Sequence, residues 1–220
     1  GGQDLVRLVD LNVSDIATAV RAGAESNDLV VTFKSSGDRL LLRDALSAAN
    51  SGGTTLALQF ADGTLWDRDA MRARALQDIV TSGNDAIYGF EGADSLHSGA
   101  GDDLMSGGAG NDSYSFARGD GHDTVLDAAT GTNTDVVTFT GLNSSDVVVE
   151  RLFRGSDTIV FRFASSPDDS LTVVDALATD GRGAEQFVFA DGVTWTRDSI
   201  LTVLDNRAPV ANPDGYYSVT

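Results

Sequence analysis

Short apolar stretches of about five residues, rather than long amphipathic runs, organise most of the chain. Leu29–Phe33 and Ile159–Phe163 are rich in β-branched and aromatic residues, which is typical of strands. Arg39–Arg43 and Ser170–Val174 follow them as the next candidate strands. The pattern therefore predicts an all-β protein built from short strands.

A hairpin and a short helix are expected near the end of each half of the chain. Asp-Gly pairs at 62–63 and 191–192 lie between apolar segments, which is a strong hairpin signal. A tryptophan follows each pair, and a short helix is predicted after each tryptophan, capped by Asp67 in the first case and by Thr196 in the second. The residues expected to face inward from these helices are Met71, Ala75, Leu76, Ile200 and Leu204.

These features belong to a long repeat. Phe60–Trp66 and Phe189–Trp195 both read Phe-Ala-Asp-Gly-x-x-Trp, and the segments before them also match. The two copies run from about 4 to 78 and from about 135 to 204. The predicted domains are a β-rich module at 1–79, a repeat segment at 80–127, a second β-rich module at 128–205, and a linker with the start of a following domain at 206–220.

A shorter, nine-residue repeat lies between the two copies. Its aspartates recur every nine residues, with a glycine two residues before each of them, and a looser fifth copy follows a small insertion. The aspartates are Asp85, Asp94, Asp103, Asp112 and, in the fifth copy, Asp123. The apolar residues two positions after them, which we expect to point inward, are Ile87, Leu96, Met105, Tyr114 and Val125. Tyr114 is expected at the end of the stack, where its hydroxyl would reach solvent.

The pattern Gly-Gly-x-Gly-x-Asp-x-apolar-x resembles the haemolysin-type RTX calcium-binding repeat. The Phe-Ala-Asp-Gly-x-x-Trp segments resemble the haemolysin-type calcium-binding related domain, and 206–220 resembles linkers that enter cadherin-like or immunoglobulin-like domains of giant bacterial surface proteins. The resemblance implies a short parallel β-roll flanked by two duplicated capping modules, each with a short helix. It also implies Ca²⁺ as the bound ion.

The physical chemistry of the repeat agrees with this interpretation. Glycine permits positive φ and a tight loop, and the three residues after it form a short strand. With two nonapeptides in each turn, Asp85 would stack on Asp103, and Asp94 on Asp112, with Asp123 continuing the first column. Carboxylates one strand spacing apart, roughly 4.8 Å, repel one another, and a hard dication with oxygen ligands between them would remove that repulsion.

The resemblance implies three ligand sets, each made of backbone carbonyls and aspartates from two stacked loops. The first joins Thr81, Gly83 and Asp85 to Ser98, Ala100 and Asp103. The second joins Phe90, Gly92 and Asp94 to Gly107, Ala109 and Asp112. The third joins Gly99, Gly101 and Asp103 to the Asp123 loop, although an insertion precedes that loop. The first repeat departs from the pattern because Val80 and Thr81 replace its leading glycines.

Composition narrows the possible partners. The net charge of −18 and the pI of about 4.1 argue against nucleic acid and against anionic membrane surfaces. There is no cysteine, so disulfides and zinc–thiolate sites are excluded. No apolar run approaches the roughly 20 residues of a membrane span, so membrane insertion is not expected.

We expect a non-enzymatic, calcium-stabilised piece of a larger protein that is secreted or attached to the cell surface, of the adhesin kind, exported by a type I route. One alternative is an accessory module of a secreted enzyme. Another is a module that binds a glycan or peptide, with Trp66 and Trp195 as carbohydrate platforms rather than core anchors. A cell-surface glycan or protein partner is not identified by the sequence. His97 and His122 occupy variable positions of the repeat and are expected to face solvent.

Overall fold

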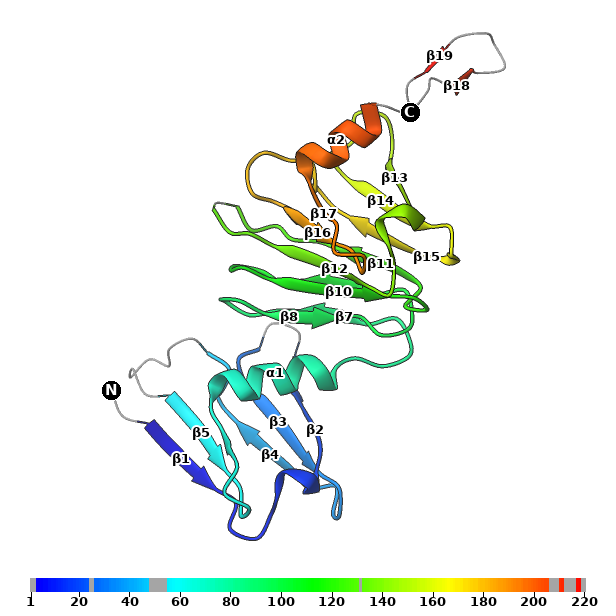
Figure 1. The fold of residues 1–220 in the computed structure, drawn as a ribbon. Coiled ribbons are helices and arrows are strands. Elements are labelled where there is room, and N and C mark those ends of the chain that lie inside the picture. The colour runs from blue at the N-terminus through cyan, green and yellow to red at the C-terminus, as the bar shows by residue number, and fades with distance from the viewer. Residues whose placement is uncertain are drawn as a thin grey trace. The chain divides into compact units, whose positions relative to one another are not determined.

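The computed structural model describes residues 3–23, 26–47, 55–130, 132–205, 210–211 and 217–218. The chain forms two compact units, Gly1–Ile79 and Val80–Thr220, which are described separately below (Figure 1). Within the described residues there are nineteen strands and only two α-helices, so the prediction of a strand-rich chain is confirmed.

The first unit contains two three-stranded sheets and one helix. One sheet pairs β1 (Gln3–Arg7) in parallel with β5 (Thr55–Gln59), which pairs antiparallel with β6 (Leu65–Trp66). A 3₁₀ turn, η1 (Val13–Asp15), leads into the antiparallel sheet of β2 (Ile16–Arg21), β3 (Leu29–Phe33) and β4 (Arg39–Leu42). The helix is α1 (Arg68–Asp78).

The start of α1 follows the sequence prediction. The Asp67 side chain accepts a 2.9 Å hydrogen bond from the backbone N–H of Ala70, which caps the helix. Met71, Ala75 and Leu76 are buried, as predicted for the inward face. The helix therefore begins where an aspartate can satisfy a free backbone N–H group, and it persists because one face packs against the core.

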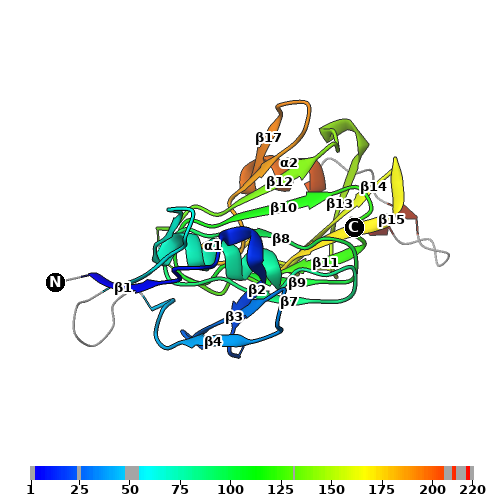
Figure 2. The same cartoon turned by 90° about the horizontal axis from the view of Figure 1, so that it is seen from below.

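In the second unit, six short strands alternate between two parallel sheets. They are β7 (Ala86–Tyr88), β8 (Ser95–His97), β9 (Leu104–Ser106), β10 (Ser113–Ala117), β11 (His122–Val125) and β12 (Val136–Thr140). One sheet runs β7–β9–β11 and the other runs β8–β10–β12. Figure 2 shows these two sets as separate layers. The predicted inward residues, Ile87, Leu96, Met105, Tyr114 and Val125, are all at most 1% exposed.

Both layers continue into the later part of the unit. An antiparallel meander consists of β13 (Val147–Arg151), β14 (Ile159–Phe163) and β15 (Ser166–Val173), and β15 extends the first layer by pairing in parallel with β11. The second layer is extended by β16 (Gln186–Val188), in parallel with β12, and then by β17 (Thr194–Thr196). The 3₁₀ turn η2 (Ser144–Asp146) precedes β13, and α2 (Arg197–Asp205) follows β17.

Aromatic side chains fill the space between the layers in this later part. Phe139 of β12 lies 5.1 Å, between ring centroids, from Phe161 of β14. It also stacks on Phe189 at 4.8 Å. All three rings are at most 2% exposed. This end of the unit is therefore closed by an aromatic core, whereas the repeats contribute mainly aliphatic side chains.

The two Asp-Gly hairpins form as predicted. Gly63 and Gly192 have φ of 86° and 80°, which L-residues rarely adopt, and each follows an aspartate whose carboxylate accepts a backbone hydrogen bond from two residues later. The tryptophan after each turn lies edge-on against a phenylalanine at 4.8 Å, in the pairs Phe60–Trp66 and Phe189–Trp195. Trp66 is 7% exposed, as expected of a core anchor and not of a carbohydrate platform.

The remaining predictions concern α2 and the C-terminal segment. Ile200 and Leu204 are buried, as predicted. The Thr196 hydroxyl lies 3.3 Å from the Ser199 hydroxyl, and its capping role stays a prediction. The predicted linker and following domain at 206–220 lie outside the described residues, except for β18 (Val210–Ala211) and β19 (Tyr217–Ser218), which pair antiparallel. Among the described helices, none has the length and apolarity needed to cross a membrane.

Candidate metal centre

Two columns of aspartates lie where the glycine-rich loops enter the strands. In the first column the backbone N–H of Asp85 donates to Oδ1 of Asp103 at 2.6 Å, and that of Asp103 donates to Oδ1 of Asp123 at 3.0 Å. In the second column the N–H of Asp94 donates to Oδ1 of Asp112 at 2.8 Å. The structure thus brings together the three pairs of aspartates that the sequence predicted to stack.

Backbone carbonyls of one loop point at the loop stacked on it. A Cβ added at Gly101, whose φ is +140°, would lie 2.8 Å from the carbonyl oxygen of Gly83. One added at Gly110, whose φ is +145°, would lie 2.3 Å from the carbonyl oxygen of Gly92. Similar overlaps would occur at Gly99 and Gly121, with the carbonyl oxygens of Thr81 and Gly101. Glycine is needed here because these oxygens occupy the space that a side chain would take.

The other predicted ligands take varied positions. The carbonyl of Ala109 accepts a 2.6 Å hydrogen bond from Gly92, and the hydroxyl of Ser98 donates to Oδ2 of Asp123 at 2.6 Å. The carbonyl of Gly107 faces Gly89, and Ala100 lies exposed at the tip of its loop. The ligand roles of all these residues stay predictions.

The first loop, which lacks the leading glycines, holds its aspartate by other means. The backbone N–H of Thr81 donates to Oδ2 of Asp85 at 2.6 Å, and the Thr81 hydroxyl donates to the same oxygen at 2.9 Å. In the next loop the N–H of Phe90 donates to Oδ2 of Asp94 in the same way. Thr81 therefore makes the same backbone contact to its aspartate as Phe90 does, and its hydroxyl gives the Asp85 carboxylate a second donor.

The aspartates deeper in the stack are buried, and no ion pair among the described residues involves them. Asp103, Asp112 and Asp123 are 3%, 1% and 1% exposed. Burial, reinforced by the neighbouring carboxylates, raises the pKa of Asp112 to about 6 and that of Asp123 to about 7, and it also raises the pKa of Asp103. Oδ2 of Asp103 and Oδ2 of Asp112 are buried and have no hydrogen-bond partner among the described residues.

The second column also contains two acidic residues that were not predicted from the sequence. The N–H of Asp112 donates to Oδ1 of Asp135 at 2.7 Å, and that of Asp135 donates to Oε2 of Glu185 at 2.7 Å. Strand register explains their placement, because Tyr114 pairs with Val137, and Val137 pairs with Phe187. Each of these three residues follows an acidic residue by two positions, so the acidic residues are aligned as well. That acid-x-apolar spacing, as in Asp135-Val136-Val137, is the signal that could have revealed them.

The position of the Tyr114 side chain differs from the prediction. Its side chain is fully buried, so the expectation that its hydroxyl reaches solvent is wrong. The hydroxyl donates to Oδ2 of Asp127 at 2.6 Å and accepts from the N–H of Gly107 at 2.7 Å. The reason is that β12 continues the sheet beyond β10, so Tyr114 lies inside the stack and not at its end.

Comparison with known families agrees with the geometry of the loops. Residues 79–114 match, in four copies, the model of the RTX calcium-binding nonapeptide repeat. Residues 79–114 therefore contain RTX-type repeats. Residues 160–199, which include β15 and β16, match the haemolysin-type calcium binding protein related domain. The predicted resemblances to the RTX repeat and, for the second module, to this related domain are therefore confirmed. A comparison with curated proteins found no match.

The RTX repeats imply calcium binding, and the chemistry of the loops fits that ion. Carboxylate and backbone carbonyl oxygens are the hard ligands that Ca²⁺ takes in sets of six to eight. The paired loops supply both kinds of oxygen, and two buried carboxylate oxygens have no hydrogen-bond partner in the part of the chain that the structure describes. The matched RTX segment ends at residue 114, so Asp123, Asp127, Asp135 and Glu185 lie outside the matched residues.

Proposed function

We propose that this chain is a calcium-stabilised structural segment of a large extracellular protein, of the adhesin kind, and not a catalytic domain. The observation that carries the proposal is the pair of buried carboxylate oxygens, Oδ2 of Asp103 and Oδ2 of Asp112, that have no partner among the described residues. Leaving a buried charge uncompensated is costly, and a dication bound between stacked loops removes that cost.

In the proposed calcium-loaded form, residues 80–127 are a parallel β-roll with ions between loops that stack on each other. The first ion takes the loops of Asp85 and Asp103, and the second takes those of Asp94 and Asp112. A third ion would use the loops of Asp103 and Asp123. Each takes carbonyls and carboxylates as in the ligand sets predicted from the sequence. The alternation of β7 to β12 between two parallel sheets supports this arrangement.

The segments on either side of the roll are proposed to be duplicated modules, at 1–79 and 128–205, that cap its ends. A short solenoid exposes apolar ends and needs such caps. For the second module, support comes from β15 and β16, which extend both layers of the repeats. Support for the duplication comes from the matching order of a 3₁₀ turn, an antiparallel meander, an Asp-Gly hairpin and a helix in each segment.

Calcium would act as a folding switch that is linked to export. With little calcium inside the cell, the aspartate columns stay uncompensated and the folding equilibrium of the repeats shifts toward the unfolded state, which suits passage through a type I channel. Outside, millimolar calcium exceeds the dissociation constants of about 10⁻⁴ to 10⁻³ M typical of extracellular modules, and binding then contributes to folding free energy. The type I route and the secreted location are proposed on the basis of the RTX resemblance.

A calcium titration tests the proposal. Protein stripped with a chelator is titrated with calcium and followed by far-UV circular dichroism, with magnesium as the ion control. We expect a calcium-selective gain of β signal that Asp103→Ala reduces and that Asp168→Ala, which removes the same charge from an exposed position, leaves intact. An unchanged spectrum, with no calcium retained after dialysis, would contradict the proposal.

A further inference from the structure

Three carboxylates converge at the end of the matched repeats. Only Asp112 belongs to a predicted ligand set. Asp112, Asp127 and Asp135 each offer an oxygen, and these oxygens all lie within 4.8 Å of one another. The three side chains are 1%, 1% and 0% exposed. Asp112 ends the loop before β10, whereas Asp127 and Asp135 lie at the two ends of the connection between β11 and β12. The cluster therefore joins the repeats to the segment that follows them.

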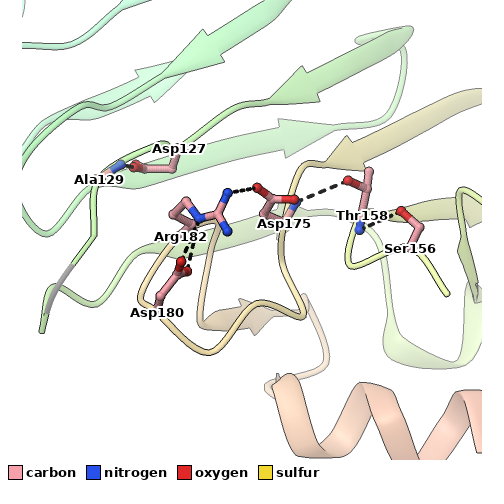
Figure 3. Close-up of polar contacts among 7 residues, drawn as sticks. All are labelled: Asp127, Ala129, Ser156, Thr158, Asp175, Asp180 and Arg182. Atoms are coloured by element: carbon pink, nitrogen blue, oxygen red, sulfur yellow. Dashed lines mark hydrogen bonds and ion pairs between the residues drawn. The ribbon is translucent and has the colours of Figure 1, made fainter.

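Hydrogen bonds hold the two later carboxylates in place. Asp127 accepts from the Tyr114 hydroxyl at Oδ2 and from the N–H of Ala129, at 3.0 Å, at Oδ1 (Figure 3). Asp135 accepts from the N–H of Asp112 at Oδ1 and from Nδ2 of Asn133, at 2.9 Å, at Oδ2. Both carboxylates are thus oriented by neutral donors, and neutral donors leave the negative charges uncancelled.

Two oxygen atoms at the cluster remain without a partner in the described part of the chain. Oδ2 of Asp112 is one of them, on a side chain that is almost completely buried. Oδ1 of Asn133 is the other, since its amide group uses only Nδ2, on Asp135. Buried oxygen atoms of this kind normally have a donor or a cation beside them, so these two oxygens are available to a cation.

No basic side chain of the described residues forms an ion pair with Asp112, Asp127 or Asp135. Figure 3 shows the guanidinium of Arg182 directed at Asp175, at 2.6 Å, and at Asp180, at 3.0 Å, instead of at Asp127. Three buried carboxylates this close together repel one another unless a cation lies between them.

We propose that Asp112, Asp127 and Asp135 bind one further calcium ion, with Asn133 Oδ1 as a fourth oxygen ligand. The spacing fits, because two oxygens on opposite sides of Ca²⁺ are separated by about 4.6–5.2 Å and one ion can therefore reach all three carboxylates. This inference rests on the proposed calcium function, and it shares Asp112 with the second repeat site. It differs in using residues that lie beyond the matched repeats, which end at 114.

The ion would fasten the connection between β11 and β12 to the repeats. The N–H of Gly183 donates to the carbonyl of Asp127 at 3.0 Å, and the N–H of Glu185 donates to the carbonyl of Asp135 at 3.0 Å. The same two aspartates therefore contact the segment of the second module that leads directly into β16. Calcium bound to their side chains would couple folding of the repeats to docking of the following segment.

Counting bound ions tests the site. Wild-type protein, Asp127→Asn, Asp135→Asn and the control Asp85→Asn are dialysed to equilibrium against calcium, and the bound metal is measured by atomic emission. Asparagine keeps an oxygen that can accept from Tyr114 or from the N–H of Asp112. We expect each of the first two variants to bind one ion fewer than wild type. Hydrogen exchange at 126–135 in calcium should be faster in both, whereas Asp85→Asn should keep wild-type protection there.

The outcomes separate the two proposals. Wild-type protein that binds no calcium would contradict the proposed function itself. Calcium bound by wild type, with the same number of ions in Asp127→Asn and Asp135→Asn, would overturn only the extra site. If the variants do not fold in calcium, anomalous scattering from a wild-type crystal grown with calcium decides instead. Peaks between the repeat loops without one among the three carboxylates would also overturn it.

Discussion

The backbone N–H of Asp85 donates to the side chain of Asp103, which lies eighteen residues later in the loop stacked above it. The same relationship links Asp103 to Asp123, so each carboxylate is fixed by the backbone of the preceding loop. The bond sets the position of the carboxylate without neutralising it. The folded repeats therefore hold a column of like charges in place, and their stability should depend on what lies between them.

Asp103→Asn should change stability in opposite directions with and without calcium. Asparagine still accepts from Asp85 but removes a buried charge, so the metal-free variant should unfold at a higher denaturant concentration than wild type. In calcium it should lose an ion worth about 2.7 kcal/mol at 100 times the dissociation constant. Urea unfolding of both forms measures this, with Asp168→Asn as the exposed control. A variant less stable than wild type in both conditions would contradict the charge argument.

Two glycine substitutions should separate loop stacking from backbone strain. Gly110 and Gly119 both have positive φ, but an added Cβ meets the Gly92 carbonyl at 2.3 Å in the first case and nothing within 4 Å in the second. Gly119→Ala should lose about 1–2 kcal/mol, the strain of an L-residue in that region. Gly110→Ala should lose about 1–3 kcal/mol more, because the loops must move apart. Thermal unfolding in calcium measures both, and equal losses would mean that the loops do not stack this closely.

The metal-free protein should lose stability as pH rises. Burial raises the pKa of Asp112 to about 6 and those of Asp123 and Asp135 to about 7, from an ordinary value of 3.8. Between those values the folded protein binds more protons than the unfolded chain, so the free energy of unfolding falls with rising pH. The stability that these three carboxyl groups contribute is fully present below about pH 4 and is lost above about pH 7.

Thermal unfolding of dialysed, calcium-free protein at pH 5 and at pH 8 checks this. The unfolding temperature should be higher at pH 5. The double variant Asp112→Asn with Asp123→Asn should show a smaller difference between the two pH values. With calcium bound, the unfolding temperature should instead be higher at pH 8, because the carboxylate ligands must be deprotonated to bind the ion. A calcium-free protein that is more stable at pH 8 would show that these carboxylates are not buried together.

Tyr114→Phe should destabilise the protein although it removes a single oxygen. The hydroxyl bridges the N–H of Gly107 and the carboxylate of Asp127, so its loss leaves a buried donor and a buried acceptor without that partner. We expect a loss of about 1–3 kcal/mol in calcium-loaded protein, measured by urea unfolding. Tyr88→Phe, at a tyrosine that is 36% exposed, is the matched control and should change stability little. Equal effects of the two would show that the bridge adds no stability.

Sequence periodicity was sufficient wherever the determinant of structure is local. A nine-residue period in glycine, aspartate and an apolar residue specifies loop, ligand and inward side chain together, so Ile87, Leu96 and Met105 could be placed inside from their spacing alone. Asp-Gly turns and the capping Asp67 were equally readable, because positive φ and a free helix N–H group are properties of a few adjacent residues. The identity of the ion was implied by the resemblance of these repeated residues to the RTX repeat.

Only the tertiary structure decided where the columns end. Asp127, Asp135 and Glu185 are separated from Asp112 by irregular insertions, so no fixed period marks them, yet pairing of β10 with β12 and of β12 with β16 aligns Asp135 and Glu185 with the second column. Tyr114 was misplaced for the same reason, since nothing near it in sequence indicates that another strand covers it. Local spacing determines what each loop can bind, whereas long-range strand register determines which loops meet.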